Sequence, residues 1–233
     1  MKVLLALSLA MLLGAPQAAQ RTITEPPSDG VSFDFTPRPD DAHQPPYIIS
    51  VPVDGLARYI EFAGKDADAP AARPVTFKLS ILTLQQLLSA YSAVERHVVQ
   101  GSCDTRLKGI ASTGKKVLTF YRDGHSISCT YDYSDDSSIS GVTAAFQAIA
   151  ETQQIGARLQ HDLRYDRLSL DVDMQALVEE NSAGRAIEMQ SIATTLQSII
   201  DDDRVLERVR RKATRLLQDS APAEPKLPPP SPR

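Results

Sequence analysis

The sequence predicts an α+β fold: an antiparallel sheet of about five strands covered by a helix, followed by a C-terminal bundle of about four helices. Two Asp-Gly pairs, each between two apolar runs, indicate β-hairpins, because the turn positions of a two-residue hairpin loop favour positive φ. After Ser137 the apolar residues recur every three or four positions, which is the spacing of amphipathic helices. Strands that come first and helices that come later are typical of an α+β domain.

The first hairpin and one further strand are expected before the first helix. Asp54-Gly55 joins the apolar runs Tyr47–Val53 and Leu56–Phe62, which should therefore pair as antiparallel strands. From Val75 to Ile81 apolar side chains alternate with polar ones, so this strand should bury one face only.

The first helix is expected at Thr83, where the alternation gives way to helical spacing. Thr83-x-x-Gln86 has the form of a capping box, in which two side chains satisfy free amides of the first turn. The helix should continue to about Val98 and end before Gly101. The second hairpin follows, with Asp123-Gly124 between Val117–Arg122 and His125–Tyr133.

The helical half should contain several amphipathic segments. One helix begins near Ile139 and continues toward Leu163, a break follows at Arg164–Arg167, and a weaker helix covers about Val172–Glu180. Asn181-Ser182 is expected to open the next helix, and Asp201–Asp203 separates it from the last one. Their apolar stripes must pack against each other or against the sheet.

The N-terminus has the pattern of a cleavable signal peptide, which we assign to residues 1–19. Lys2 precedes an apolar run from Val3 to Ala15, which suits a signal sequence but is shorter than the ~20 residues of a membrane-spanning helix. Cleavage is expected between Ala18 and Gln20, and no cysteine follows that could carry a lipid anchor. The sequence thus predicts an extracytoplasmic protein, periplasmic or secreted, with no transmembrane segment after cleavage. An uncleaved N-terminal anchor is the alternative.

The prolines divide the rest of the chain. All 16 lie at or before Pro74 or at or after Pro222. Because proline disrupts helices and central strands, the proline-rich flanks are predicted to be a flexible linker at 20–46 and a disordered tail at 219–233. Residues 47–218 should form a single α+β domain, with the sheet and its helix in 47–134 and the helical part in 135–218.

The two cysteines, Cys103 and Cys129, are predicted to form a disulfide. In an oxidising compartment a single pair is most simply one bridge, which here would tie the end of the first helix to the second hairpin. A catalytic or metal-binding thiol is the alternative, but neither cysteine belongs to a Cys-x-x-Cys motif.

Candidate catalytic residues are few. His97 at the end of the first helix and His125 at the start of the Cys129 strand could meet near the disulfide, together with Asp104 and Asp123. Helix capping and turn formation explain the same residues without catalysis. The acidic runs at 132–136 and 201–203 lack the spacing of a calcium loop, and we expect no metal and no cofactor.

The last helix carries a basic surface formed by Arg204, Arg208, Arg211 and Arg215. This surface could bind an anionic lipid, a cell-wall polymer or an acidic protein, although a solvated helix face is the simpler interpretation. Nucleic acid is not an expected partner, because the formal net charge is −4 and becomes −5 when Lys2 is removed with the signal peptide.

Two functional hypotheses follow from the sequence. The first is a non-catalytic binding or structural module outside the cytoplasm, with another exported protein or a cell-envelope polymer as its partner. The alternative is an extracytoplasmic hydrolase or a protease-inhibitor-like protein that uses the His97 and His125 neighbourhood.

Overall fold

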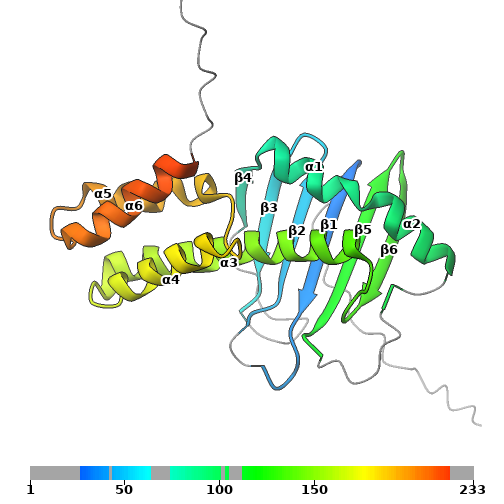
Figure 1. The fold of residues 1–233 in the computed structure, drawn as a ribbon, viewed down its shortest axis with the longest axis horizontal. Coiled ribbons are helices and arrows are strands. Elements are labelled where there is room, and N and C mark those ends of the chain that lie inside the picture. The colour runs from blue at the N-terminus through cyan, green and yellow to red at the C-terminus, as the bar shows by residue number, and fades with distance from the viewer. Residues whose placement is uncertain (1–26, 42–43, 64–73, 101–102, 105–111, 221–233) are drawn as a thin grey trace, which may run out of the picture.

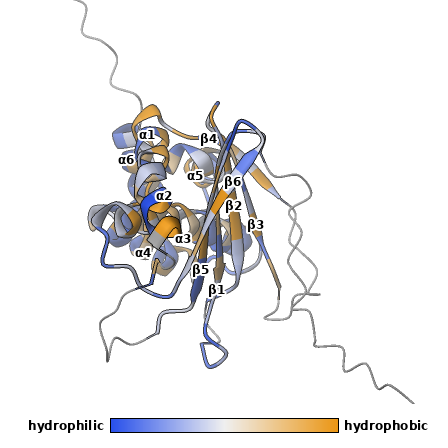
Figure 2. Cartoon of the chain, turned by 90° about the vertical axis from the view of Figure 1, so that its right-hand side faces the viewer, coloured by the Kyte–Doolittle hydropathy of each residue, from blue (hydrophilic) through white to orange (hydrophobic). Residues whose placement is uncertain are grey.

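A computed structural model of the chain describes residues 27–41, 44–63, 74–100, 103–104 and 112–220. The fold is α+β, as the sequence predicts. In this part of the chain a six-stranded antiparallel sheet carries helices on one face, and a helical part lies beyond its β4 edge (Figures 1 and 2). In their order across the sheet the strands are β4 (Val75–Lys78), β3 (Leu56–Glu61), β2 (Tyr47–Pro52), β1 (Gly30–Thr36), β5 (Lys115–Arg122) and β6 (His125–Tyr131).

The sixth strand lies where the sequence predicted a linker. Residues 30–36 form β1, which pairs with both β2 and β5 near the centre of the sheet. Val31, Phe33 and Phe35 point to the core and alternate with more polar residues, so the two-residue period of a strand was present. The flanking prolines led to the wrong prediction. They lie outside the strand, so no ladder hydrogen bond is lost.

Both predicted hairpins form, but their turns differ. Asp123 and Gly124 both have positive φ, at 52° and 75°, as the two-residue loop requires. In the first hairpin Gly55 has φ 75°. Asp54 is not left-handed there. Its carboxylate instead accepts a hydrogen bond from the Leu56 amide at 2.8 Å, which closes the turn through a side chain.

The helix expected from Thr83 to Val98 is two helices, α1 (Ile81–Ser89) and α2 (Tyr91–Gln100), which meet at Ala90. The N-cap is Ser80 rather than Thr83, since the Ser80 hydroxyl accepts a hydrogen bond from the Thr83 amide at 3.3 Å. β4 ends at Lys78, so the change from strand to helix comes a few residues earlier than the pattern indicated. Both helices cover the same face of the sheet as the first half of α3 (Ser137–Tyr165) (Figure 1).

The helix α3 joins two apolar cores. Its 29 residues extend about 43 Å at ~1.5 Å per residue, which carries it across the sheet and beyond it (Figure 1). In the first half Phe146 stacks on Phe33 of β1, with ring centroids 5.0 Å apart. In the second half Ile155 and Leu159 belong to a separate core shared with the later helices.

The helical part contains α4 (Leu170–Ser182), a 3₁₀ helix η1 (Met189–Ile192), α5 (Ala193–Asp201) and α6 (Glu207–Ser220). The break predicted at 164–167 is confirmed. Asn181 and Ser182 do not open a new helix but end α4, because Gly184 adopts φ 71° and stops it. The helix α6 continues to Ser220, just past the predicted start of the tail.

Close contacts fix the helical part against the rest of the fold. The carboxylate of Glu188 accepts hydrogen bonds from the Ser80 hydroxyl at 2.7 Å and the Ser80 amide at 3.0 Å. Thr152 of α3 donates to the carbonyl of Ile187 at 2.6 Å. No helix among the described residues is long and apolar enough to cross a membrane. The predicted signal peptide and residues 221–233 of the predicted tail lie outside the described part.

Candidate functional site

The predicted disulfide is present between Cys103 and Cys129. Their Cα atoms are 5.8 Å apart, within the usual range of about 4.4–6.8 Å for a bridged pair. Cys129 lies in β6 beneath α2, and both cysteines are buried. The bridge therefore fixes Cys103 to the sheet, and it is consistent with folding in an oxidising compartment.

The residues Asp123 and His125 lie at the N-terminal end of β6. Asp123 occupies the left-handed turn position, and its amide donates to the carboxylate of Asp29 at 2.8 Å. His125 begins the strand opposite Arg122 and is exposed. Asp123 therefore forms the hairpin turn, and His125 is the first strand residue after it.

The other two candidates lie at the opposite end of β6. Asp104 accepts hydrogen bonds from the amides of Asp132 and Tyr133, directly after the strand, at 3.3 and 3.2 Å. His97 Nε2 lies 3.1 Å from the Asp136 carboxylate, which also caps α3 by accepting from two backbone amides. Burial raises the pKa of the Asp136 carboxyl, but the hydrogen bonds from His97 and the two amides outweigh it and lower that pKa.

The structure therefore separates the two histidines. The seven residues of β6 lie between the two ends and span about 20 Å at ~3.3 Å per residue. Proton transfer between catalytic groups needs hydrogen-bonding reach. The hydrolase hypothesis, which required His97 and His125 in one place, gains no support from these positions.

The predicted basic surface forms one wall of a groove between α4 and α6. The groove has a volume of about 430 Å³. Four cations and one acid line it, together with polar and apolar residues of both helices: Arg208, Arg211, Lys212, Arg215 and Asp219, with Val178, Asn181, Ser182 and Leu216. Arg204 lies outside it and pairs with Asp202 at 2.9 Å, so three of the four predicted arginines line the groove.

Neighbouring acids compensate only part of this charge. Asp171 of α4 contacts both Arg208 and Lys212, at 3.1 and 3.3 Å, and these hydrogen bonds hold its pKa below the usual value. Arg211 pairs with Glu207 at 3.7 Å, but both side chains are more than 70% exposed. Such an exposed pair contributes little, so the Arg211 guanidinium stays available to a ligand.

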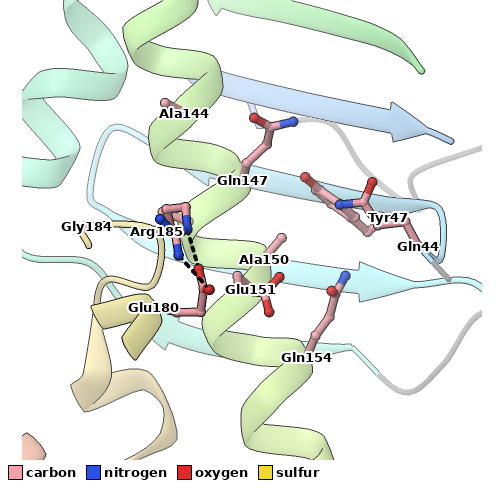
Figure 3. A pocket seen from close by; sticks show the side chains of 11 residues that line it. Gln44, Tyr47, Ala144, Gln147, Ala150, Glu151, Gln154, Glu180, Gly184 and Arg185 are labelled. Carbon is pink, nitrogen blue, oxygen red and sulfur yellow. Dashed lines mark hydrogen bonds and ion pairs between the residues drawn. The ribbon is translucent and has the colours of Figure 1, made fainter. Parts of the chain in front are cut away.

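A second cavity, of about 360 Å³, lies beside the middle of α3 (Figure 3). One wall comes from a single face of that helix, one from the start of β2, and one from the end of α4. Its main polar residues are Gln44 and Tyr47 near β2, Gln147, Glu151 and Gln154 on α3, and Glu180 and Arg185 at the end of α4.

Tyr47 is held rigidly at this cavity. Its ring lies among Phe33, Phe35 and Tyr59, with centroid separations of 5.2–6.2 Å. The side chain is 2% exposed, and its hydroxyl points toward α3 (Figure 3). Within the described residues this hydroxyl forms no hydrogen bond. Burial, followed by the negative charge of Glu151, raises the pKa of Tyr47 well above its usual value.

Glu151 is half-buried and lies between Tyr47 and the Glu180–Arg185 pair (Figure 3). Burial raises the pKa of its carboxyl, and the positive charge of Arg158 opposes that shift in part. The Arg158 guanidinium is 4.0 Å away, beyond hydrogen-bonding distance, and also lies 3.5 Å from Asp173. The Glu151 carboxylate is thus partly desolvated and has, among the described residues, no ion-pair partner closer than 4.0 Å.

The Glu180–Arg185 pair is placed by the end of α4. With Gly184 left-handed, the amides of Gly184 and Arg185 donate to the carbonyls of Asn181 and Glu180, at 3.0 and 2.8 Å. This is a Schellman motif, which folds the chain back over the last turn. Arg185 then donates two hydrogen bonds to the Glu180 carboxylate, at 2.6 and 2.9 Å, and neutralises it.

No group of three or more His, Cys, Asp or Glu side chains within the described residues could hold a metal ion. Neither a family model, nor a curated protein, nor a solved structure matches this chain. The candidate sites are therefore defined by geometry alone.

Sequence reasoning missed the cavity at Tyr47. Its residues come from positions 44 to 185, and no local motif links them. One signal was present, since Ala144, Gln147, Glu151 and Gln154 follow helical spacing along one side of the helix.

Proposed function

We propose that this protein is a non-catalytic binding module that acts outside the cytoplasm, and that the groove between α4 and α6 binds acidic groups of a cell-envelope polymer. The observation that carries the proposal is the lining of the groove, which contains the cations Arg208, Arg211, Lys212 and Arg215 and one acid, Asp219. Asp171 pairs with Arg208 and Lys212, so Arg211 and Arg215 are the cations most open to a ligand. Guanidinium groups bind carboxylates and phosphates through paired hydrogen bonds, so several arginines along one groove suit a polyanion.

The charge distribution supports this choice of partner. The chain as a whole is acidic, with 29 Asp and Glu against 25 Lys and Arg. A cationic groove on an acidic protein attracts an anion locally while the remaining surface repels it, which favours binding in one place. Apolar side chains of Val178 and Leu216 in the same groove would contact the uncharged backbone of a polymer.

The proposed location rests on the signal-peptide pattern of residues 1–19 and on the disulfide. Fractionation of the host cell tests it: the mature chain, lacking about 19 residues, should be found outside the cytoplasm. Recovery of an unprocessed chain in the cytoplasm would contradict this part of the proposal.

The groove itself can be tested by charge reversal. Binding of fluorescent polyphosphate and poly-L-glutamate to the mature chain would be measured by anisotropy at several salt concentrations. The double variant Arg211→Glu/Arg215→Glu should weaken binding about tenfold or more, equivalent to ~1.4 kcal/mol, and rising salt should weaken wild-type binding. Both arginines are exposed, so the fold should persist.

The matched control is Lys115→Glu/Arg164→Glu, which changes the net charge equally on exposed positions outside the groove. This control should bind almost as the wild type does. Equal losses in the two double variants, or no binding of either polyanion by the wild type, would overturn the assignment of the groove.

A further inference from the structure

We propose that the cavity beside α3 is a second binding site, specific for a small polar amine whose ammonium group lies between the Glu151 carboxylate and the Tyr47 hydroxyl. The site is independent of the α4–α6 groove, because the two share no lining residue. The cavity would bind a cation, whereas the groove would bind an anion.

The first reason is the unused hydrogen-bonding capacity of Tyr47. The residue is almost fully buried, but its hydroxyl opens into the cavity, where it can donate or accept a hydrogen bond. The aromatic rings around Tyr47 prevent it from turning away, so the hydroxyl stays directed into the cavity (Figure 3). A ligand that supplies a donor or acceptor there would satisfy it.

The second reason is the sign of the charge. Of the two carboxylates that line the cavity, Glu180 is neutralised by Arg185 through two hydrogen bonds, and Glu151 is not. The lining therefore carries one excess negative charge. A partly desolvated carboxylate favours a cation strongly, because the attraction is less screened than in water. Arg158 is too distant and too exposed, at 48%, to satisfy this carboxylate.

The third reason is the lining around the charge, which selects a polar ligand. Side chains of Gln44, Gln147 and Gln154 present amide groups to the cavity. Gln154 uses its amide nitrogen to donate to Tyr59 at 3.3 Å, which directs its position. A volume of about 360 Å³ admits a small molecule and lies at the lower end of ligand pockets. An amino sugar or a short diamine combines the required cation with further hydrogen-bonding groups.

Titration calorimetry on the mature chain tests the proposal with two pairs of probes: glucosamine against glucose, and putrescine against 1,4-butanediol. The amines should bind and the neutral counterparts should not. Glu151→Gln should weaken amine binding about tenfold or more, as expected for a charge-assisted hydrogen bond. Tyr47→Phe should weaken it by a smaller factor. Glu95→Gln, which removes an exposed acid on α2, is the charge-matched control and should bind as the wild type does.

Two measurements show whether a loss of amine binding in Glu151→Gln comes from the lost charge or from unfolding. Glu151→Gln removes a half-buried charge, so its thermal midpoint near neutral pH should equal or exceed that of the wild type. Because burial raises the pKa of Glu151, amine binding should weaken as the pH falls through that pKa, and this pH dependence should vanish in Glu151→Gln.

The proposal is overturned if glucose and 1,4-butanediol bind as well as the amines, if Glu151→Gln retains wild-type affinity, or if neither amine binds at millimolar concentration. None of these results would bear on polyanion binding by Arg211 and Arg215, so the two proposals fail separately.

Discussion

Gly156, in the middle of α3, allows the 3₁₀ helix η1 to pack directly on the backbone of α3. A Cβ atom at this position would lie 2.5 Å from Cγ2 and 3.2 Å from Cβ of Ile192, which is itself 6% exposed. Carbon atoms in van der Waals contact are about 3.5–4.0 Å apart. Gly156→Ala should therefore force η1 away from α3 or distort Ile192.

Two opposing effects set the change in the free energy of unfolding caused by Gly156→Ala. Alanine is a better helix former than glycine by about 1 kcal/mol, which would stabilise α3. Inserting a methyl group into a filled core costs about 1–3 kcal/mol. Since the shortest approach is more than 1 Å inside normal contact, we take the upper half of that range. The expected net effect is a loss of about 1–2 kcal/mol in the free energy of unfolding.

A second variant, Ile192→Ala, separates the steric clash from the change in helix propensity. Ile192→Ala alone should cost about 2–5 kcal/mol, because it removes most of a buried side chain. It also removes Cγ2, the atom nearest to the new methyl group, and Cδ1, and leaves only the Cβ contact at 3.2 Å. In that background Gly156→Ala should become neutral or stabilising by up to ~1 kcal/mol. The same substitution thus loses its cost or changes sign, with a coupling of about 2 kcal/mol between the two positions.

Urea unfolding followed by circular dichroism would provide the four free energies, with the disulfide kept oxidised in every sample. The Ile192→Ala protein must retain a cooperative transition for the comparison to hold. If Gly156→Ala raises the free energy of unfolding in the wild-type background, or if the two substitutions are additive, the steric argument is refuted.

Two further predictions concern the sheet and the start of α3. Replacing both Cys103 and Cys129 with serine should lower the free energy of unfolding by about 3.5 kcal/mol in the chain-entropy model for this loop, and alkylation of the unreduced wild type should detect no free thiol by mass spectrometry. Asp136→Ala should cost about 1 kcal/mol through loss of the α3 cap and the His97 contact. Because folding lowers the Asp136 pKa, its contribution is complete above the unfolded value of about 4 and is lost as pH falls through the folded pKa. Urea titrations at pH 3 to 7 should show this difference shrinking with acid, and a constant difference would contradict it.

Much of the fold could be predicted from local patterns. Asp-Gly pairs specified both hairpins, and the apolar spacing specified α3 and α6, because these signals depend on residues only a few positions apart. The strand β1 was missed although its residues alternate, since prolines nearby outweighed a short pattern. Asn181-Ser182 was expected to open the next helix, but these residues are the last two of α4, which the left-handed Gly184 stops.

The sequence predicted the basic face of the last helix, but not the groove that it lines or the separation of the two histidines. The arginines of the last helix are neighbours along one face, so helical spacing alone grouped three of them correctly. That they line a groove depended on α4, which no pattern in α6 could indicate. The disulfide suggested that His97 and His125 could meet, but the length of β6 keeps them at opposite ends.

By itself, then, the sequence determined the class of fold, most secondary structure, the cysteine pair and the position of the basic face. Each of these follows from backbone preference, periodicity or composition, which act over short distances or over the whole chain. The tertiary structure alone decided which polar groups are desolvated and which are paired. Tyr47, Glu151 and Arg185 meet only because α3 crosses the sheet and Gly184 turns the chain back toward it. Burial and hydrogen bonding at such a site depend on residues more than a hundred positions apart, and no local pattern contains that information.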